Sequence, residues 1–219
     1  LSPDDLSNDA FPFATSREIE LGFAMVRASR ISYVGELGWE LYIPSEFTTG
    51  VYDVLMEAGG EFGLRPVGMH AMNSLRIEKA YRHYGHDIAD TDTPLEGGLG
   101  FAVKLDKAAG FIGRDALLRQ KEAGLNKKLV QFQLTDPEPM LYHNEPIWRD
   151  GALAGYTRSA MYGHTLGGAI ALGYIEHTGG VNADYVNSGS YEIEIAGVRY
   201  AATASLRPLY DPKSERIKA

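Results

Sequence analysis

The chain has 219 residues, of which 44% are hydrophobic and 23% charged, and its formal net charge is −8 at pH 7. This length is sufficient to bury a sizeable core. The acidic balance does not suit the phosphate backbone of nucleic acids, and the absence of cysteine excludes disulfides and thiolate sites. No apolar run approaches the ~18 residues that span a membrane, and the acidic start lacks the pattern of a signal peptide. We therefore expect a cytoplasmic protein, or a mitochondrial-matrix protein if the source is eukaryotic, with no nucleic-acid or membrane partner.

The first 43 residues predict a turn followed by strands. The polar stretch 2–9 offers several helix caps and predicts a short helix or a turn that ends before Phe11. From residue 17 to residue 43 apolar and polar side chains alternate, which predicts strands, with breaks at Gly22 and Gly35.

Two helices and a long loop are expected next. Apolar residues at helical spacing predict a helix from about residue 47 that the glycine pair 59–60 stops. A second helix is predicted from about residue 67 to residue 82, after Pro66, because this stretch contains good helix formers with apolar residues on one side. The stretch 83–101 is rich in glycine, aspartate and threonine and predicts a loop, a type of segment that often carries function.

The pattern changes in the second half of the chain. Residues 101–124 predict a strand, a turn and a short helix flanked by glycines. Short alternating strands follow, joined by turn pairs such as Asp150-Gly151 and Ala196-Gly197. Five or six strands at this spacing predict a small antiparallel barrel or sandwich. We expect an α+β region over residues 1–124 and an antiparallel β-barrel over residues 125–219.

One short stretch, SYVGELGWEL at residues 32–41, combines a strand pattern with the composition of a binding site. It places Glu36 and Glu40 beside aromatic residues and two glycines. A carboxylate next to aromatic rings suits a flat heterocycle, because its two oxygens accept two parallel N–H donors from an amidine-like edge. The same spacing also fits two acids on the solvent face of an amphipathic strand, and the pattern alone leaves both interpretations open.

Other groups of reactive side chains match no established motif. His83 and His86 are followed by two aspartates, but no HExxH or comparable metal-ligand set occurs, so no metal site is expected. The serine-nucleophile motif GxSxG is absent. The glycine clusters at 97–100 and 167–168 lack the GK[ST] ending of a phosphate-binding loop.

Four segments match, in order and spacing, the motifs of one family. They are SYVGELGWELYIP, HAMNSLRIEKAYRHYGHDI, DTDTPLEGGLGFAVKLDK with FIGRDALLRQKEAG, and YGHTLGGAIALGYI. They resemble, respectively, Y-T-G-E-x-G-x-E, A-R-D-S-L-R-L-E, T-T-P-x-E with F-I-G-R-E, and S-P-T-L-G-x-x-I-A of the glycine-cleavage T-proteins, the aminomethyltransferases. The resemblance covers residues 17–210. Details such as the tail PLYDPKSERIKA are similar to the C-terminal folate domain of dimethylglycine and sarcosine dehydrogenases.

The resemblance implies a T-protein-like α+β folate-binding domain, without its N-terminal part, followed by a small barrel. It implies that the chain binds tetrahydrofolate as part of a protein that transfers a one-carbon unit and forms 5,10-methylenetetrahydrofolate. The absence of an initiator methionine suggests that the chain is a fragment or a processed product. In the implied parent, a preceding flavin domain holds FAD and is the partner of this domain.

Family roles transfer to four positions of this sequence. Glu40 matches the carboxylate that binds the pterin ring, and Tyr33 matches a folate-contacting tyrosine. Phe101 stands where the family often has a tryptophan beside the ligand, and Tyr81 matches a further aromatic contact. The family's catalytic aspartate belongs to the missing part, upstream of Leu1, so no catalytic residue is expected in this chain.

Two departures from the family pattern leave other functions open. Met72 replaces the family's arginine, and Gly168 stands where a basic residue is frequent. One alternative is an aminomethyltransferase of the glycine cleavage system, which works with a lipoylated carrier protein. The other is a non-catalytic regulatory or scaffold module of the same fold, as in a phosphatase regulatory subunit similar to these dehydrogenases.

Overall fold

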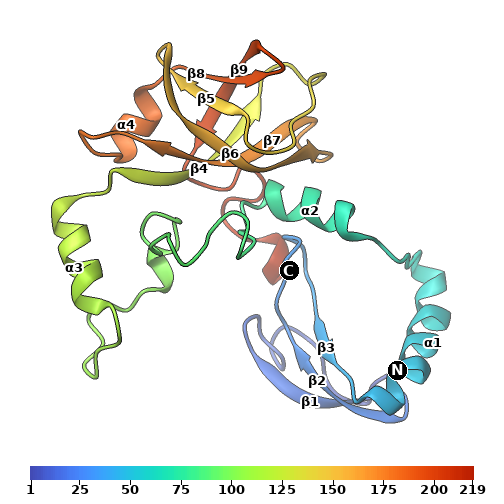
Figure 1. Ribbon diagram of the computed structural model, residues 1–219. Coiled ribbons are helices and arrows are strands. Elements are labelled where there is room, and N and C mark those ends of the chain that lie inside the picture. The colour runs from blue at the N-terminus through green and yellow to red at the C-terminus, as the bar shows by residue number, and fades with distance from the viewer. The chain divides into compact units, whose positions relative to one another are not determined.

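The computed structural model describes residues 1–219 and divides them into two units, Leu1–Met72 with Lys213–Ala219, and Asn73–Pro212. The first unit carries a three-stranded sheet and the second carries a closed barrel (Figure 1). No helix in either unit has the length and apolar character needed to cross a membrane. The predicted division near residue 125 stays a prediction.

The sheet of the first unit consists of β1 (Ser16–Leu21), β2 (Ala24–Ser29) and β3 (Glu40–Tyr42), paired antiparallel in that order. Alternation places one side of each strand in the core, as the sequence pattern predicts for β1 and β2. The buried members of this core are Phe11, Ile19, Leu21, Ala24, Val26, Ala28 and Val51. The preceding residues 1–10 form turns rather than a helix.

The predicted strand over residues 32–39 is wrong, because this segment is a series of bends. Gly35 has φ +83°, a left-handed conformation that suits glycine, and its N–H donates to Ser32 Oγ over 3.0 Å. A Cβ at Gly38 would lie 2.9 Å from the backbone oxygen of Ile31. The two glycines therefore fold the segment back on itself, and pairing resumes only at β3.

The predicted helix after residue 47 is confirmed, and the α-helix ends at the glycine pair 59–60 as predicted. A 3-10 turn η1 (Ser45–Phe47) leads into α1 (Thr48–Gly59), and η2 (Gly60–Phe62) continues the helical path. The path ends at Gly63, where φ is +71°. A glycine in the left-handed conformation is a common way for a helix to end.

The second predicted helix is α2 (Met69–Glu78), which is shorter than the expected 67–82. Ala80 adopts a left-handed φ of +55°, and the N–H of Tyr81 donates to the carbonyl of Arg76 over 2.8 Å. This is the hydrogen-bond pattern of a Schellman C-cap, with alanine in the place that glycine usually occupies. Because this position holds alanine rather than glycine, the sequence does not indicate that the helix ends here.

The loop predicted after α2 is confirmed, whereas the strand predicted around residues 101–107 is wrong. The chain there forms η3 (Gly100–Ala102) and then successive turns, because its N–H groups bond to carbonyls two or three residues back rather than to a neighbouring strand. The short helix follows as α3 (Arg114–Ala123), between two glycines as expected.

The predicted barrel is confirmed as a closed antiparallel barrel of six strands in the order β4-β7-β6-β5-β8-β9 (Figure 1). The strands are β4 (Lys127–Leu134), β5 (Pro146–Arg149), β6 (Ala152–Gly163), β7 (Gly168–Glu176), β8 (Tyr191–Ile195) and β9 (Val198–Ser205). Both predicted two-residue turns join strands, with positive φ at Asp150, Gly151, Ala196 and Gly197. Positive φ at both central residues is the property of the type I′ turn.

Two short helices complete the structure. The helix α4 (Ala183–Ser188), which the sequence pattern did not indicate, begins after Asn182, whose side chain accepts the Tyr185 N–H over 2.8 Å. A final 3-10 turn, η4 (Arg216–Lys218), belongs to the first unit. The barrel interior is filled by buried apolar side chains, including Val130, Phe132, Ile147, Ala171, Ile175 and Ile193.

Candidate functional site

Glu40 stands at the start of β3, on the side of the sheet that faces away from the core. Its strand neighbour Leu41 points toward the apolar cluster, so the side chains of Glu40 and Tyr42 are exposed. Across the sheet Glu40 pairs with Ser29, and Tyr42 pairs with Arg27. The outer face of the sheet therefore presents a carboxylate, a phenol, a hydroxyl and a guanidinium to solvent.

A pocket of about 500 Å³ opens on this same face. Its lining residues are Glu18, Met25, Arg27, Leu41, Tyr42, Ile43 and Pro44. Arg27 forms a solvent-exposed ion pair with Glu18 over 3.4 Å, so the charges within the pocket are balanced in part. The combination of an aromatic ring, apolar side chains and a few polar groups is typical of a small-molecule site.

Tyr42 connects Glu40 to the pocket. Its hydroxyl donates to Glu40 Oε2 over 3.1 Å, and this hydrogen bond together with the negative charge raises the pKa of Tyr42. A carboxylate has about four acceptor positions, so one hydrogen bond from Tyr42 leaves Glu40 able to accept two parallel N–H donors from a ligand. The tyrosine also restricts the orientation of the carboxylate.

Trp39 and Tyr33, the aromatic residues near Glu40 in sequence, differ in their surroundings. Trp39 packs edge-on against the buried Phe11, with ring centroids 4.7 Å apart, and the buried Arg30 guanidinium lies 5.5 Å from its ring. Trp39 is therefore part of the core. Tyr33 is half-buried in the bends before β3, as is Glu36.

The other two predicted site residues belong to the second unit. Tyr81 is half-buried next to the C-terminus of α2, where burial and then the charge of Asp211 raise its pKa. Phe101 lies in η3 and is 83% exposed. Glu40 and Tyr33 thus lie in one unit and Tyr81 and Phe101 in the other. A single pocket shared by all four stays a prediction.

The end of α2 carries charged residues of the family-like motif RIEK, and they are buried. Arg76 is 2% exposed and forms an ion pair with the fully buried Asp87. Its second terminal nitrogen donates to Ser159 Oγ on β6 over 2.7 Å, and its Nε donates to Asn73 Oδ1 over 3.1 Å. Arg76 therefore fixes the loop after α2 to the barrel.

The two charged residues that follow are also used inside the second unit. Glu78 is 1% exposed and accepts the backbone N–H groups of Thr165 and Leu166 over 2.7 and 3.0 Å. Lys79 forms a buried ion pair with Asp211 over 2.9 Å. These residues have structural partners on the barrel side of α2 and are not presented to a ligand.

The histidines next to this network do not form a metal centre. His86 Nδ1 lies 3.0 Å from Ser159 Oγ, and its ring centroid is 6.1 Å from that of His83. No group of three or more histidine, aspartate or glutamate side chains is arranged to hold a metal ion.

Sequence reasoning missed Tyr42 and Arg27 as neighbours of Glu40, and Met25 as a further residue of the pocket. The alternation of β3 contains a signal for Tyr42, because residues i and i+2 of a strand share a face. Arg27 and Met25 come from β2, and no local pattern identifies the register that brings them to this face.

Two family models match the chain. The GCVT N-terminal domain matches residues 1–107, and the glycine cleavage T-protein C-terminal barrel domain matches residues 127–211. The second match coincides with the six-stranded barrel.

Known proteins of related sequence are much longer than this chain. Mitochondrial sarcosine dehydrogenase of Homo sapiens is 45% identical over 216 residues, which are 98% of this chain and 23% of that protein. The mitochondrial pyruvate dehydrogenase phosphatase regulatory subunit of Mus musculus is 41% identical over 221 residues, 95% of this chain and 25% of that protein. The chain thus spans about a quarter of the length of these relatives.

A solved structure shares the fold. The aminomethyltransferase T of the glycine cleavage system of Bartonella henselae superposes with a TM-score of 0.77 at 24% identity, covering 91% of this chain and 53% of that one. The match confirms the predicted α+β region followed by a barrel.

Proposed function

Because the chain belongs to the glycine-cleavage T-protein family, we propose that it binds a reduced folate through the outer face of the β1–β3 sheet. Glu40 is the anchor in this proposal, and its two carboxylate oxygens accept the paired N–H groups at the edge of the pterin ring. The observation that carries the proposal is the exposed carboxylate, oriented by Tyr42 over 3.1 Å, beside a pocket of about 500 Å³.

The chemistry of this face supports a flat, partly polar ligand. Met25 and Tyr42 offer apolar and aromatic surface to a ring, while Glu40 supplies directional, charge-assisted hydrogen bonds. Tyr33 lies in the bends that lead into the same strand, and we propose that it borders the ligand. Tyr81 and Phe101 of the second unit are proposed as further aromatic contacts.

The reaction we propose for the complete protein is the transfer of a one-carbon unit from an N-methylglycine-derived iminium to tetrahydrofolate, which yields 5,10-methylenetetrahydrofolate. The folate carries the one-carbon unit, and this chain contributes its binding and orientation. The aspartate that assists attack by the folate nitrogen, and FAD that oxidises the N-methyl amine, are assigned to the remainder of a longer dehydrogenase of the sarcosine or dimethylglycine type. No residue of this chain is assigned to FAD.

Calorimetric titration of the chain with tetrahydrofolate under anaerobic conditions tests the proposal. We expect saturable binding, and we expect Glu40→Gln to weaken it by about ten- to a hundredfold, because a charge-assisted hydrogen bond contributes ~1.5–3 kcal/mol. Glu20→Gln is the matched control, since Glu20 is an exposed acid on β1 outside the pocket lining.

Two results would refute the role of Glu40. One is an unchanged folate affinity in Glu40→Gln, and the other is an equal loss in Glu20→Gln, which would indicate a general effect of charge. If neither this chain nor a full-length parent binds a reduced folate, the folate proposal itself is wrong.

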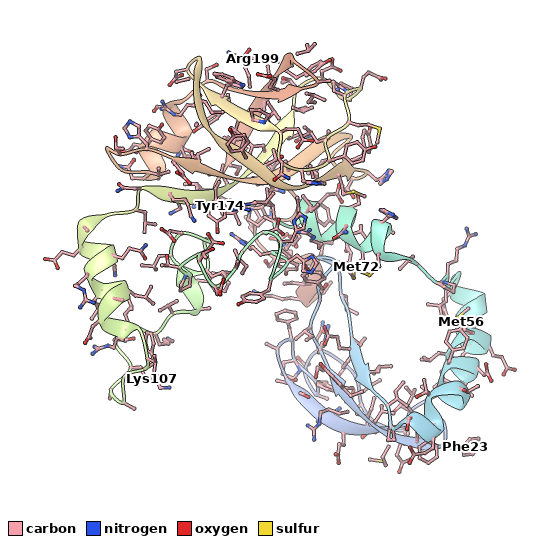
Figure 2. All side chains as sticks on the ribbon, in the orientation of Figure 1. Phe23, Met56, Met72, Lys107, Tyr174 and Arg199 are labelled. Atoms are coloured by element: carbon pink, nitrogen blue, oxygen red, sulfur yellow. The ribbon has the colours of Figure 1, made fainter.

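A regulatory role without catalysis is the second candidate, because one relative at 41% identity is a phosphatase regulatory subunit by name. Met72 stands where the family's arginine is expected, and Figure 2 shows it on α2. A full-length parent that binds folate but produces no 5,10-methylenetetrahydrofolate with any N-methylglycine would favour this role. An active parent would exclude it.

A further inference from the structure

The barrel carries a pocket of its own, of about 550 Å³, on the outer surface of β6 and β7. Its lining residues are Asn144, Leu153, Ala154, Gly155, Tyr156, Arg158, Tyr174 and Glu176. The pocket lies within the second unit and shares no residue with the Glu40 face. Its volume is in the range of small-molecule sites.

Three irregularities of the backbone coincide at this pocket. A Cβ at Gly155 would overlap the carbonyl oxygen of Tyr174, so only glycine allows β6 to approach β7 so closely. The register between β6 and β7 shifts at Arg158, which is an extra, bulged residue. Asn144 has a left-handed φ of +63°. Bulges commonly redirect a side chain beside a site, and here the bulged residue is the arginine.

Arg158 and Glu176 bring opposite charges to the pocket and neither forms an ion pair. The Arg158 guanidinium lies 5.7 Å from the centroid of the Tyr174 ring. Tyr174 is 4% exposed, its hydroxyl makes no hydrogen bond, and burial raises its pKa, so that it stays a neutral donor. Figure 2 shows Tyr174 on the side of the barrel toward the loop that follows α2.

The spacing of the two charges limits the ligand. Tyr156 pairs directly with Tyr174, while Glu176 lies two residues beyond on β7 and Arg158 two residues beyond on β6, in opposite directions along the ladder. At ~3.3 Å per residue their Cα atoms are about 13 Å apart along the ladder, so a ligand that reaches both side chains needs its two charges at opposite ends of a short chain. The positive charge of Arg158 thus lies at one end of the Tyr156–Tyr174 pair, and the negative charge of Glu176 lies at the other end.

We propose that this pocket binds a small zwitterionic amino acid. The ligand's carboxylate pairs with the forked guanidinium of Arg158, its ammonium pairs with Glu176, and its carbon chain lies on Tyr156. Arginine suits this role because its planar donors match the two oxygens of a carboxylate. The site is separate from the proposed folate face and does not depend on it.

Calorimetric titration of the chain with 5-aminopentanoate tests the site, with pentanoate and pentylamine as half-ligands of equal chain length. We expect the zwitterion to bind at least about tenfold more tightly than either half, since each end contributes a charge-assisted contact. Arg158→Gln and Glu176→Gln should each weaken the zwitterion by about tenfold. Arg158→Gln should leave pentylamine binding unchanged.

Arg199→Gln is the control variant, because Arg199, labelled on the barrel in Figure 2, is outside the pocket lining. Its guanidinium stacks on Trp148, 3.4 Å from the ring centroid. This variant should bind the zwitterion like the unmodified chain, and so should Glu40→Gln. Pentanoate that binds as well as the zwitterion, an equal loss in Arg199→Gln, or no binding at all would overturn the proposal. None of these outcomes bears on folate binding, which is measured separately.

Discussion

Two glutamates of the chain, both within segments that match family motifs, have opposite surroundings. Glu40 on β3 is exposed and bonds to a neighbouring tyrosine, whereas Glu78 at the end of α2 is 1% exposed and accepts two backbone N–H groups. A motif therefore records residues that bind ligands together with residues that maintain the fold. Burial and hydrogen-bond partners separate the two classes.

The difference has a direct physical meaning. A buried carboxylate has to be hydrogen-bonded inside the protein, so the oxygens of Glu78 are committed to the barrel. An exposed carboxylate exchanges water for ligand donors at low cost, which makes Glu40 the available acid. Arg76 and Lys79 follow the same rule as Glu78, because each pairs with an aspartate inside the second unit.

The largest effect is expected from Arg76→Leu, which breaks the buried network at the end of α2. The change leaves the Asp87 charge unpaired and removes the bond to Ser159, so we expect a loss of about 3–5 kcal/mol in the free energy of unfolding. Urea denaturation measures it, with Arg27→Leu as the control. The exposed Arg27–Glu18 pair should contribute no more than about 1 kcal/mol. Equal losses in the two variants would contradict the assignment.

The second prediction compares the two glutamates directly by the same substitution. Glu78→Gln should cost about 1–3 kcal/mol of unfolding free energy, because the charge that accepts two buried N–H groups is lost. Glu40→Gln should change stability by less than about 0.5 kcal/mol, as is usual for exposed positions. The reverse order of the two losses in urea denaturation would show that Glu40 is the structural acid.

The parts of the fold that could be predicted from the sequence are those that local sequence patterns determine. The barrel, its two hairpins, α1 and α3 follow from alternation, helical spacing and turn dipeptides, which are local signals. The strand expected over 32–39 failed, because the conformations of Gly35 and Gly38 depend on contacts with Ser32 and Ile31. The alternation of apolar residues is the same for a bent segment as for a strand.

The candidate site was predictable only in part, for the same reason. Glu40 was identified by a motif, and Tyr42 shares its strand face. Arg27 arrives through the register of β2 and β3, and the burial of Glu78 depends on the β6–β7 connection, which lies more than 80 residues away. No local pattern distinguishes an acid that will be buried from one that will be exposed.

The third prediction concerns His86, whose ring contacts the buried network. His86 Nδ1 lies 3.0 Å from Ser159 Oγ and 3.9 Å from Asp87 Oδ1. Burial, and then repulsion from Arg76 and the neighbouring His143, lowers the pKa of His86 below its usual 6.5, although Asp87 opposes this shift. The unfolded chain therefore binds a proton at this position more readily than the folded chain.

This difference in proton binding at His86 determines how the stability of the fold changes with pH. The contribution of His86 to stability is complete above pH 6.5, decreases as the pH falls below this value, and levels off below the folded-state pKa. Urea midpoints measured across this window should fall less steeply in His86→Gln than in the unmodified chain. A steeper fall in the variant would mean that the charged histidine stabilises the fold through Asp87.

The smallest effect is expected from Tyr42→Phe, which tests whether the Tyr42 hydroxyl orients the exposed Glu40. The Tyr42 hydroxyl acts on the ligand through Glu40, as a positioning group, so its loss should weaken tetrahydrofolate binding by only about two- to fivefold, because an exposed hydrogen bond replaces bonds to water. Calorimetric titration measures this difference, and the stability of the chain should stay the same because both side chains are exposed.

Combining Tyr42→Phe with Glu40→Gln distinguishes a hydroxyl that orients Glu40 from one that contacts the ligand directly. If Tyr42 acts by orienting Glu40, Tyr42→Phe has no further effect on folate affinity once Glu40 is Gln, and the interaction energy of the double-mutant cycle equals the whole effect of Tyr42→Phe. Additive losses would instead mean that the Tyr42 hydroxyl contacts the ligand itself. Glu40→Gln removes the hydrogen bond and the charge that raise the pKa of Tyr42, and should return that pKa toward 10.0. Spectrophotometric titration measures this without ligand, and the difference between chains with and without Tyr42→Phe isolates this one of the 13 tyrosines. An unchanged tyrosine pKa in Glu40→Gln would show that the hydrogen bond does not persist in solution, and Glu40 would then have to orient its carboxylate without help.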